Sequence, residues 1–448
     1  MKYYSTNRQS TNVDFRQALF TGQAPDRGLY MPDSIPVLTS GDLSTLKGKS
    51  YPEVARTVLD KYLEDVFPNE ALERLCLNAY DFTVPIEHVT DRLHIMRLDR
   101  GPTASFKDFA ARMMAQMMKN LLQKTGKKLV VLTATSGDTG SAIAHAYHGI
   151  EGIDVVVLFP PTEVSDRQRQ QMTTLGGNVT IIAVEGKFDH CQALVKQAFS
   201  DPALDSIRLT SANSINIGRL LPQIVYYVYA CLQIADSGEP VVFSTPSGNF
   251  GDMMGALLAK RMGLPMSRII VATNANDEVP NFLATGVYRK IDPSRVCISN
   301  AMNVGHPSNF ARVVDLYGGS MDEKGIVHRQ PDLERMRRDL FAVSVDDTQT
   351  RLAIQNAWKN HRLLLEPHGA VGWAGLGHYL EQTGDPSFCV SVETAHPAKF
   401  PDEIQSLLNF SPEIPPSLAG IESREESYVR MAADYPSFRE FLRKRYIE

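Results

Sequence analysis

The stretch Gly101-Pro102-Thr103-Ala104-Ser105-Phe106-Lys107-Asp108-Phe109 leads from a turn into a helix, and the rest of the chain is organised around it. Ser105 is a favourable N-cap residue, and Asp108 three residues later predicts a pair that resembles a capping box. Lys107 falls in the first turn, where the positive end of the helix dipole disfavours a second positive charge. We therefore expect Lys107 to lose its proton more readily than an exposed lysine, as a Schiff-base lysine must. The alternative is an ordinary lysine that flanks a core helix.

The chain around this stretch alternates short apolar strands with helices. Strands rich in β-branched residues that are separated by helices predict parallel sheet covered on both faces. We expect strands at residues 93–98, 129–132, 155–159, 179–184, 207–210, 241–243, 269–272 and 389–392, and helices at residues 141–148, 167–175, 189–199 and 218–234. The fold class predicted from this pattern is α/β.

Length and composition limit the class of protein. A chain of 448 residues is too long for one simple core and predicts two or three domains. The net charge of -5 gives no reason to expect nucleic-acid or membrane binding. The first residues contain no apolar signal core, so we expect no export. The five cysteines are far apart and form no CxxC pair, which indicates a reducing cytoplasm and no metal or disulfide framework.

Two similar loops each follow a strand and open a helix. They are residues 133–141 and 244–252, and both contain the pattern Ser-Gly-[Asp/Asn]-x-Gly. Their glycines let the backbone approach a ligand closely, and the helix N-terminus offers free N–H donors. Each loop is a candidate anion cradle. Neither has the Walker A lysine or the GxGxxG fingerprint of dinucleotide-binding proteins. Two cradles and a capped lysine suggest a site that holds two anionic groups around an amine.

Three further segments carry polar groups. Residues 213–219 gather amides and Arg219 at a helix start, a pattern that suits carboxylate or phosphate recognition but also simple capping. Residues 393–399 follow the last strand, and the carboxyl ends of strands are where open α/β sheets bind ligands. Residues 366–369 form a turn to which the sequence assigns no chemistry.

Taken together, residues 105–108, 135–140, 213–216, 246–252 and 393–399 resemble threonine synthase, in its longer microbial and fungal form. The resemblance extends to residues 27–32 and covers most of the chain. One departure is Glu366-Pro367-His368-Gly369, where the family pattern has Asp-Pro-His followed by Ser or Thr. The resemblance implies an α/β fold-type-II pyridoxal-phosphate enzyme, similar to the tryptophan synthase β subunit, with the cofactor between two parallel-sheet domains. The implied domains are an N-terminal helical or mixed domain at 1–90, a large cofactor-binding domain at 91–124 and 226–411, a small α/β domain at 125–225 and a C-terminal helical extension at 412–448.

The resemblance also implies the reaction and its residues. The reaction converts O-phospho-L-homoserine and water to L-threonine and phosphate, by γ-elimination and then β-addition of water. Lys107 is the implied Schiff-base lysine and the catalytic residue, and no metal is implied. The other residues that the resemblance or the loop chemistry assigns are, for pyridoxal 5'-phosphate, Gly248, Asn249, Phe250, Gly251, Asp252 and Thr394, and, for the substrate, Ser136, Gly137, Asp138, Thr139, Asn213, Arg219 and Lys399.

Other functions remain open at this stage. The same cofactor class contains dehydratases and phospholyases that act on related amino acids or their phosphates. A binding or regulatory protein on this scaffold would be expected to lack the Schiff-base lysine, and Lys107 is present. A nucleotide-binding enzyme is a weaker alternative because both standard nucleotide loops are missing. We expect a cytoplasmic enzyme with a small-molecule substrate, either a monomer or a weak homo-oligomer.

Overall fold

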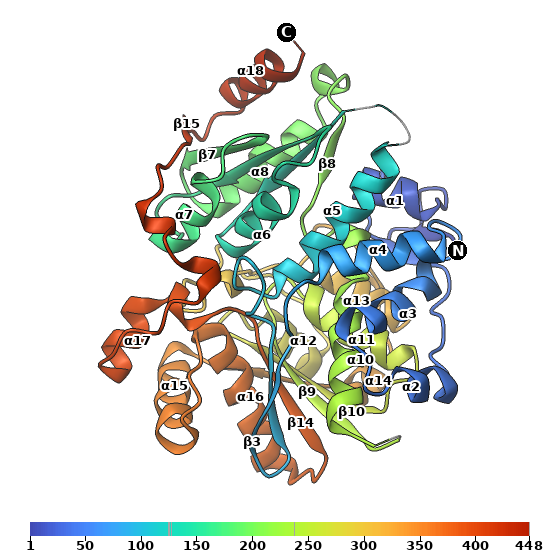
Figure 1. Ribbon diagram of the computed structural model, residues 1–448. Helices are drawn as coiled ribbons and strands as arrows, with labels where there is room; N and C mark the ends of the chain where they lie inside the picture. The colour runs from blue at the N-terminus through green and yellow to red at the C-terminus, as the bar shows by residue number, and fades with distance from the viewer. Residues whose placement is uncertain (124–125, 127, 237, 448) are drawn as a thin grey trace.

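Two mainly parallel sheets form the interior of the protein (Figure 1). The computed structural model describes residues 1–448 except residues 124–125, 127, 237 and 448. The central strands of both sheets are almost wholly buried, as expected where helices cover both faces of a parallel sheet. None of the described helices is both long enough and apolar enough to cross a membrane.

The larger sheet has six strands in the order β13-β10-β9-β14-β4-β3. All neighbouring pairs are parallel except β3 and β4, which form an antiparallel hairpin at one edge. The strands are β3 (Ile86–Thr90), β4 (Leu93–Arg97), β9 (Val241–Pro246), β10 (Met266–Thr273), β13 (Leu340–Ser344) and β14 (Phe388–Glu393). One face is covered by α9 (Ile217–Leu220), α10 (Gln223–Ile234) and α11 (Gly251–Arg261), and the other by α15 (Asp347–His361) and α16 (Pro367–Thr383).

The smaller sheet has five parallel strands in the order β15-β7-β6-β5-β8. They are β5 (Leu129–Ala134), β6 (Ile153–Phe159), β7 (Val179–Glu185), β8 (Leu209–Ser211) and β15 (Val429–Ala432). On one face lie α5 (Lys107–Gln123), α6 (Asp138–Tyr147) and α7 (Asp166–Thr173). On the other face, α8 (Phe188–Phe199) and α18 (Tyr435–Tyr446) bury a separate apolar cluster.

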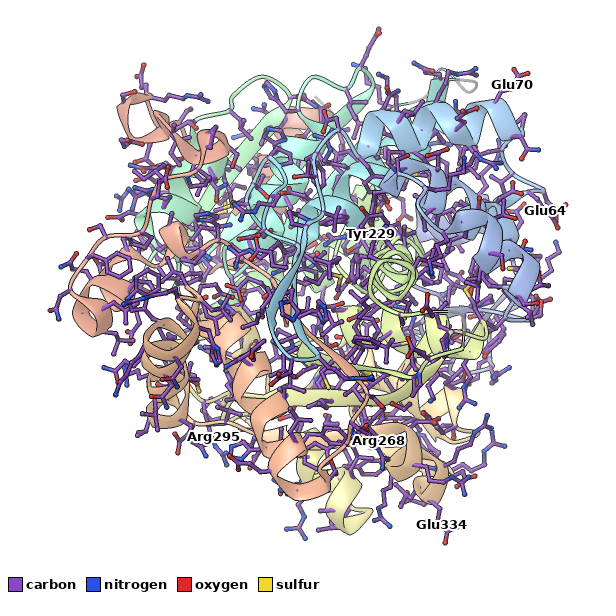
Figure 2. The ribbon with its side chains drawn as sticks, turned by 60° about the horizontal axis from the view of Figure 1, so that its bottom comes forward. Glu64, Glu70, Tyr229, Arg268, Arg295 and Glu334 are labelled. Carbon is purple, nitrogen blue, oxygen red and sulfur yellow. The ribbon has the colours of Figure 1, made fainter. Side chains whose placement is uncertain are left out.

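The N-terminal residues form a small unit that shares its core with α5 and α10. Its elements are β1 (Tyr3–Ser5), α1 (Phe15–Thr21), β2 (Tyr30–Pro32), α2 (Ser40–Leu46), α3 (Tyr51–Leu63) and α4 (Asn69–Ala79). The aromatic rings of Tyr51 and Tyr229 meet edge to face, 5.2 Å apart, and tie α3 to α10. Figure 2 labels Tyr229, which is partly buried, and the exposed carboxylates of Glu64, Glu70 and Glu334.

Shorter elements connect the strands and helices of the two sheets. They are α12 (Glu278–Thr285), α13 (Phe310–Leu316), β11 (Ser320–Met321), β12 (Val327–Arg329), α14 (Leu333–Asp339), α17 (Pro401–Leu408) and the 3-10 turns η1 (Pro202–Leu204), η2 (Asn300–Met302), η3 (Pro397–Lys399), η4 (Pro416–Leu418) and η5 (Ile421–Ser423). The turn η2 and the loops beside it bring polar residues toward the ends of the large-sheet strands.

The structure differs from the expected elements at three places. The helix expected at residues 218–234 is two helices, α9 and α10, because Pro222 between them cannot donate a backbone hydrogen bond. Strand β3 belongs to the large sheet although residues 1–90 were expected to form a separate unit. The C-terminal segment, expected to be helical, also contributes β15 to the small sheet. The predicted boundary between residues 124 and 125 lies outside the described residues, and the domain limits stay a prediction.

Candidate active site

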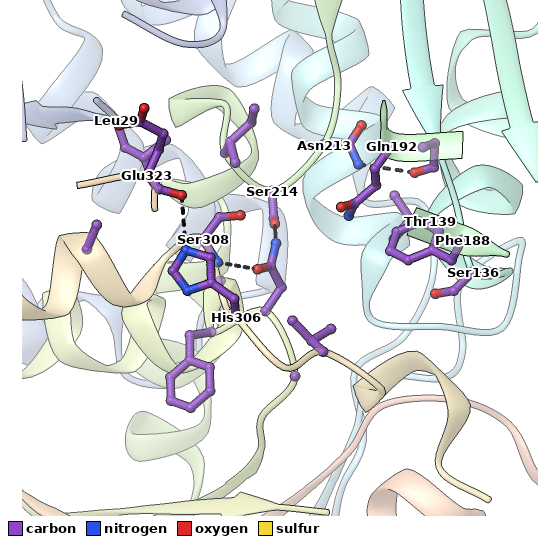
Figure 3. A pocket seen from close by; sticks show the side chains of 18 of the residues that line it. Leu29, Ser136, Thr139, Phe188, Gln192, Asn213, Ser214, His306, Ser308 and Glu323 are labelled. Carbon is purple, nitrogen blue, oxygen red and sulfur yellow. Dashed lines mark hydrogen bonds between the residues drawn. The ribbon is translucent and has the colours of Figure 1, made fainter. Parts of the chain in front are cut away.

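A cavity of about 990 Å³ lies where the carboxyl ends of strands from both sheets meet. The loops after β5, β9 and β14 all reach it, together with the first residues of α5. Helix α8 and the N-terminal unit line its outer part, and so does the segment around His306 and Ser308 (Figure 3). Strand carboxyl ends are the usual ligand-binding edge of an α/β sheet, so this cavity is the candidate site.

The turn before α5 delivers Lys107 to this cavity. Asp108 accepts hydrogen bonds from the backbone N–H of Thr103 (2.8 Å) and from its hydroxyl (2.6 Å). The expected cap by Ser105 is wrong, because the Ser105 hydroxyl is buried without a partner among the described residues. The backbone of the turn is held instead by the loop after β14, since the Phe106 N–H donates to the carbonyl of Thr394 over 2.8 Å.

Lys107 is the first residue of α5, and its side chain is 14% exposed, at the cavity surface. Its ammonium lies 3.8 Å from Oδ2 of Asp138 and 4.6 Å from the centre of the Phe106 ring. Burial lowers the pKa of Lys107, the Asp138 carboxylate opposes that shift, and the cations Lys399 and Arg219 add to it. The direction agrees with the sequence expectation of an easily deprotonated amine, although burial rather than the helix dipole is the main cause.

The first loop forms the wall of the cavity opposite Lys107. Ser136, Asp138 and Thr139 line the cavity, whereas Gly137 turns behind it with φ +128°. The Thr135 hydroxyl accepts the backbone N–H groups of Gly137 (2.9 Å) and Gly140 (2.7 Å). Two donors of this predicted cradle are therefore used within the loop. Among the described residues, the backbone N–H groups of Ser136, Asp138 and Thr139 donate no hydrogen bond, and the hydroxyls of Ser136 and Thr139 are further donors at the cavity.

The second loop, residues 248–252, presents free backbone donors. Among the described residues, the N–H groups of Gly248, Asn249, Phe250 and Gly251 donate no hydrogen bond, and all four residues line the cavity. Phe250 has a left-handed backbone (φ +62°) that lets α11 start immediately after it. A helix start with several free N–H groups is suited to a phosphate.

A polar network holds this loop in place. The Asn249 amide donates to the Ser214 hydroxyl (2.6 Å), and its oxygen accepts the N–H of Ser308 (2.7 Å). Ser214 is in turn fixed by Arg312, whose guanidinium is fully buried and donates to the carbonyls of Ser214 (3.3 Å), Ile215 (2.7 Å) and Tyr30 (3.0 Å). Burial lowers the pKa of Arg312 to about 9. The hydrogen bonds of Arg312 therefore link the N-terminal unit, the segment after β8 and the second loop at residues 248–252.

Asp252 is the one acidic member of the second loop. It lies in the first turn of α11, where its Oδ1 accepts the hydroxyls of Tyr226 (2.5 Å) and Tyr227 (2.6 Å). Its Oδ2 is buried without a partner among the described residues. Burial raises the pKa of Asp252 to about 6, against the lowering effect of the two tyrosines. The two hydroxyls turn this carboxyl toward α10, where it anchors the start of α11.

The residues predicted to bind the substrate are placed unequally. Arg219 lines the cavity but is nearly buried, and among the described residues its guanidinium donates to the Ala212 carbonyl over 2.7 Å. No carboxylate pairs with it among the described residues, its Nε has no partner, and burial lowers its pKa to about 10. Asn213 also lines the cavity, although its amide is bonded to the Ala134 carbonyl (3.1 Å).

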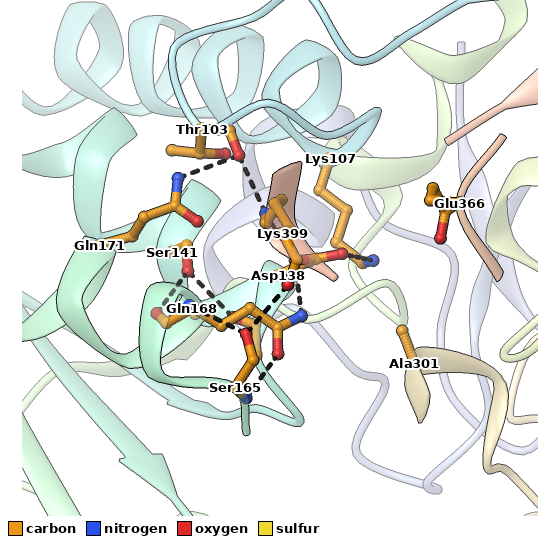
Figure 4. Close-up of polar contacts among 12 residues, drawn as sticks. Thr103, Lys107, Asp138, Ser141, Ser165, Gln168, Gln171, Ala301, Glu366 and Lys399 are labelled. Carbon is orange, nitrogen blue, oxygen red and sulfur yellow. Dashed lines mark hydrogen bonds and ion pairs between the residues drawn. The ribbon is translucent and has the colours of Figure 1, made fainter. Parts of the chain in front are cut away.

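Lys399 is placed differently from the expectation that it holds the substrate phosphate. Its side chain is fully buried, and it is not one of the described residues that line the cavity. Its ammonium donates to the Thr103 carbonyl over 2.9 Å and pairs with Oδ1 of Asp138 at 2.6 Å (Figure 4). The substrate cavity therefore meets the Asp138 carboxylate and not the Lys399 ammonium behind it.

The turn at residues 366–369, to which the sequence assigned no chemistry, reaches the cavity through His368. The Glu366 carboxylate caps α16 and holds Nδ1 of His368 at 2.5 Å, while Nε2 accepts the N–H of Ala301 over 3.0 Å. Gly369 is required because a Cβ there would overlap the Glu393 carboxyl. Burial and the nearby Glu366 raise the pKa of Glu393 well above its usual value, and the Arg97 guanidinium opposes that shift.

The cavity fits a ligand that carries an aldehyde and a phosphate. Lys107 supplies an amine with a lowered pKa, and the second loop supplies free N–H donors at a helix start. The Thr394 hydroxyl, at the carboxyl end of β14, lines the same cavity and makes no hydrogen bond to the described residues. These groups suit pyridoxal phosphate, with the amine at one end and the phosphate donors at the other.

Comparison with known proteins identifies these features. The family described as pyridoxal-phosphate dependent enzyme matches residues 83–394, and the threonine synthase N-terminal and C-terminal families match residues 2–80 and 369–442. Threonine synthase of Escherichia coli strain K12 is 36% identical over 444 residues and 99% of each chain. A crystal structure of PLP-bound threonine synthase from Brucella melitensis is 33% identical, with a TM-score of 0.92 over 100% of both chains. Threonine deaminase isoform 2 of Solanum lycopersicum, 18% identical over 87% of this chain and 98% of that one, shares the fold alone (TM-score 0.56).

Proposed function

The chain belongs to the threonine synthase family of pyridoxal-phosphate-dependent enzymes, and on that premise we propose how its residues carry the reaction. It has the fold-type-II architecture of that cofactor class and acts as a pyridoxal-phosphate-dependent lyase in threonine synthesis. The substrate is O-phospho-L-homoserine, and the products are L-threonine and phosphate. The observation that carries the assignment of roles is that Lys107 and the free N–H groups of residues 248–251 face one cavity.

Lys107 would hold the cofactor, and the substrate amine would displace it and so free its amine to act as the base. When bound, pyridoxal phosphate withdraws electrons from Cα of the substrate. Lys107 takes the proton from Cα and serves as the proton carrier between Cα and Cβ, which its position at the cavity surface supports. Phosphate leaves from Cγ, Cγ gains a proton to become the methyl group, and water adds to Cβ. An amine with a lowered pKa loses its proton at a lower pH than an ordinary lysine, which favours this role.

One set of donors would bind the cofactor phosphate and a second set would bind the substrate. The loop at residues 248–252 would hold the cofactor phosphate on its N–H groups, with Asn249 fixed by Ser214. Ser136 and Thr139 would orient the substrate from the wall opposite Lys107. Arg219 is a nearly buried cation that lines the cavity without a carboxylate partner among the described residues, and a bound phosphate would give it the partner that it lacks.

Product analysis with O-phospho-L-homoserine tests this function. We expect L-threonine and inorganic phosphate in a one-to-one ratio, with no release of ammonia. The alternative, a dehydratase or phospholyase of the same cofactor class, would release ammonia and a keto acid. Ammonia as the main nitrogen product would therefore contradict the proposal.

The setting of the enzyme is part of the same proposal. A cytoplasmic location is supported by the five unpaired and buried cysteines, which a reducing compartment would keep as thiols. We propose a monomer or a weak homo-oligomer, because residues of this one chain line the cavity from every side that the structure describes. Sedimentation at several protein concentrations measures the oligomeric state directly.

A further inference from the structure

Three charged side chains form a row that runs from the interior to the cavity surface, in the order Lys399, Asp138, Lys107 (Figure 4). Each comes from a different part of the fold, because Lys399 lies in η3 after the large sheet, Asp138 opens α6 of the small-sheet layer, and Lys107 opens α5. Oδ1 of Asp138 accepts Lys399 at 2.6 Å and the Gln168 amide at 2.9 Å. Oδ2 faces Lys107 at 3.8 Å, which is beyond a hydrogen bond.

The row contains two ammonium groups and one carboxylate. In a buried site of low polarity, one carboxylate stabilises one neighbouring cation well, and a second cation nearby is in excess. Lys399 is the closer partner, is fully buried and has a second acceptor in the Thr103 carbonyl. Lys107 is the more distant partner and reaches the cavity. The ammonium that gives up its proton more easily is therefore the one on Lys107.

We propose that Lys399 is a positioning residue whose ammonium pairs with the Asp138 carboxylate and neutralises it. Lys107 is then free to become a neutral amine. Without Lys399, the buried carboxylate would have Lys107 as its nearest cation and would hold it protonated. With Lys399 in place, the Asp138 carboxylate already has a cation as its partner, whether or not Lys107 is protonated. The same pair links the segment after β14 to the start of α6, so it also fixes Oδ2 of Asp138 opposite Lys107.

Other charged groups act on Lys107 but do not replace this arrangement. Arg219 at α9 lowers its proton affinity and Glu366 before α16 raises it, both with smaller effects than Asp138 and Lys399. Asp252 at α11 is itself influenced by Lys107, but its carboxylate is bonded to the hydroxyls of two tyrosines. All three groups are unchanged in the variants described next, so differences between variants report the Lys399–Asp138 pair.

The test measures the pH at which Lys107 becomes reactive. The full-length protein, freed of cofactor, is labelled with trace acetic anhydride over a range of pH, and acetylation of the Lys107 peptide is followed by mass spectrometry. The reagent can reach Lys107 because its side chain is 14% exposed. Lys399→Met should raise the midpoint pH by about 1 to 3 units, the usual effect of an unshared opposite charge at this range. Lys399→Arg should restore the midpoint toward that of the original protein.

Asp138→Asn gives the opposite prediction and protects the test if Lys399→Met fails to fold. An amide in place of the carboxylate can still accept from Lys399 and Gln168, but it cannot hold Lys107 protonated, so the midpoint should fall. The double variant should lie below Lys399→Met. Lys260→Met is the matched control, since that partly buried lysine pairs with Asp339 at 3.5 Å, outside the cavity, and its removal should leave the midpoint unchanged.

Two results would overturn the inference: an unchanged midpoint in Lys399→Met, or an unchanged or higher midpoint in Asp138→Asn. The inference rests on the proposed role of Lys107 in the reaction, but the labelling midpoint is read without turnover. A failure of the proposed function would show in the reaction products and leave the midpoints as predicted, so the two failures can be told apart.

Discussion

The substitution Gly248→Ala adds one methyl group to the second loop, residues 248–252, where the loop packs against the turn η2. It tests whether that loop binds the cofactor phosphate. A Cβ built on Gly248 would lie 2.9 Å from Cα of Met302 and 3.0 Å from the carbonyl oxygen of Ala301, in the turn η2. Ordinary carbon contacts begin near ~3.5 Å, so the two backbones must separate by roughly half an ångström. Overpacking of this kind costs about 1–3 kcal/mol. If the loop yields, that cost weakens cofactor binding by about 5- to 150-fold, at ~1.4 kcal/mol for each factor of ten.

The assay for Gly248→Ala is a fluorescence titration of cofactor-free protein with pyridoxal phosphate, run beside thermal unfolding of the same sample. Gly377→Ala in α16 is the matched control, because a Cβ at Gly377 meets nothing within 4 Å. It should leave the cofactor affinity unchanged and raise the stability by about 1 kcal/mol, as Gly→Ala does inside a helix. A Gly248→Ala protein that binds pyridoxal phosphate with the original affinity would refute the reasoning. If its thermal stability also fell, the clash would be real but the loop would not be the phosphate site.

Three further predictions follow from buried charges. Arg219→Met should raise the KM for O-phospho-L-homoserine by about 10- to 150-fold, the worth of one bond to a charged group. It should lower the free energy of unfolding by only about 1–3 kcal/mol, because one buried carbonyl, that of Ala212, loses its donor. An unchanged KM would exclude Arg219 from the phosphate site. Arg312→Met should lower the free energy of unfolding by about 3 kcal/mol or more, since several backbone carbonyls lose their buried donor, and urea unfolding measures it. Burial raises the pKa of Glu278 to about 7, so folding favours its protonated form, and the stability that this form contributes is lost as the pH rises from 4.5 to 7. In urea unfolding, Glu278→Gln should match the original protein near pH 4 and be more stable by about 3 kcal/mol above pH 7. A constant difference across that range would contradict the assignment.

The parallel strands could be predicted from the sequence because their signal is local. Runs such as Val155–Phe159 are continuous, apolar and rich in β-branched residues, a pattern that is typical of a strand buried on both faces of a parallel sheet. The same reasoning missed β13 and β15, whose burial is mixed and whose place in a sheet is set by a partner distant in the chain. The break at Pro222 was available in the sequence, because a proline inside an apolar helical pattern commonly ends the helix.

The site was predictable as a set of residue types but not as a set of contacts. Lys107 and the glycine loop carry their chemistry in their own sequence, and the structure brings both to one cavity. Their functional roles stay predictions. Lys399 was predicted to bind phosphate because it is a cation in the segment after a strand, where open α/β sheets bind ligands. Its partner Asp138 lies 261 positions away in sequence and close in space. Arg312 carried no local signal at all, since its acceptors are backbone carbonyls from other segments.

The central claim is that Lys107 is the residue that binds pyridoxal phosphate covalently, and one measurement tests it most directly. The purified protein is mixed with pyridoxal phosphate, reduced with borohydride, digested and mapped by mass spectrometry. We predict a single phosphopyridoxyl group on the peptide that contains Lys107, and its loss in Lys107→Ala. A label on another lysine of the cavity, such as Lys290, or no label at all with Lys107 intact, would contradict the claim.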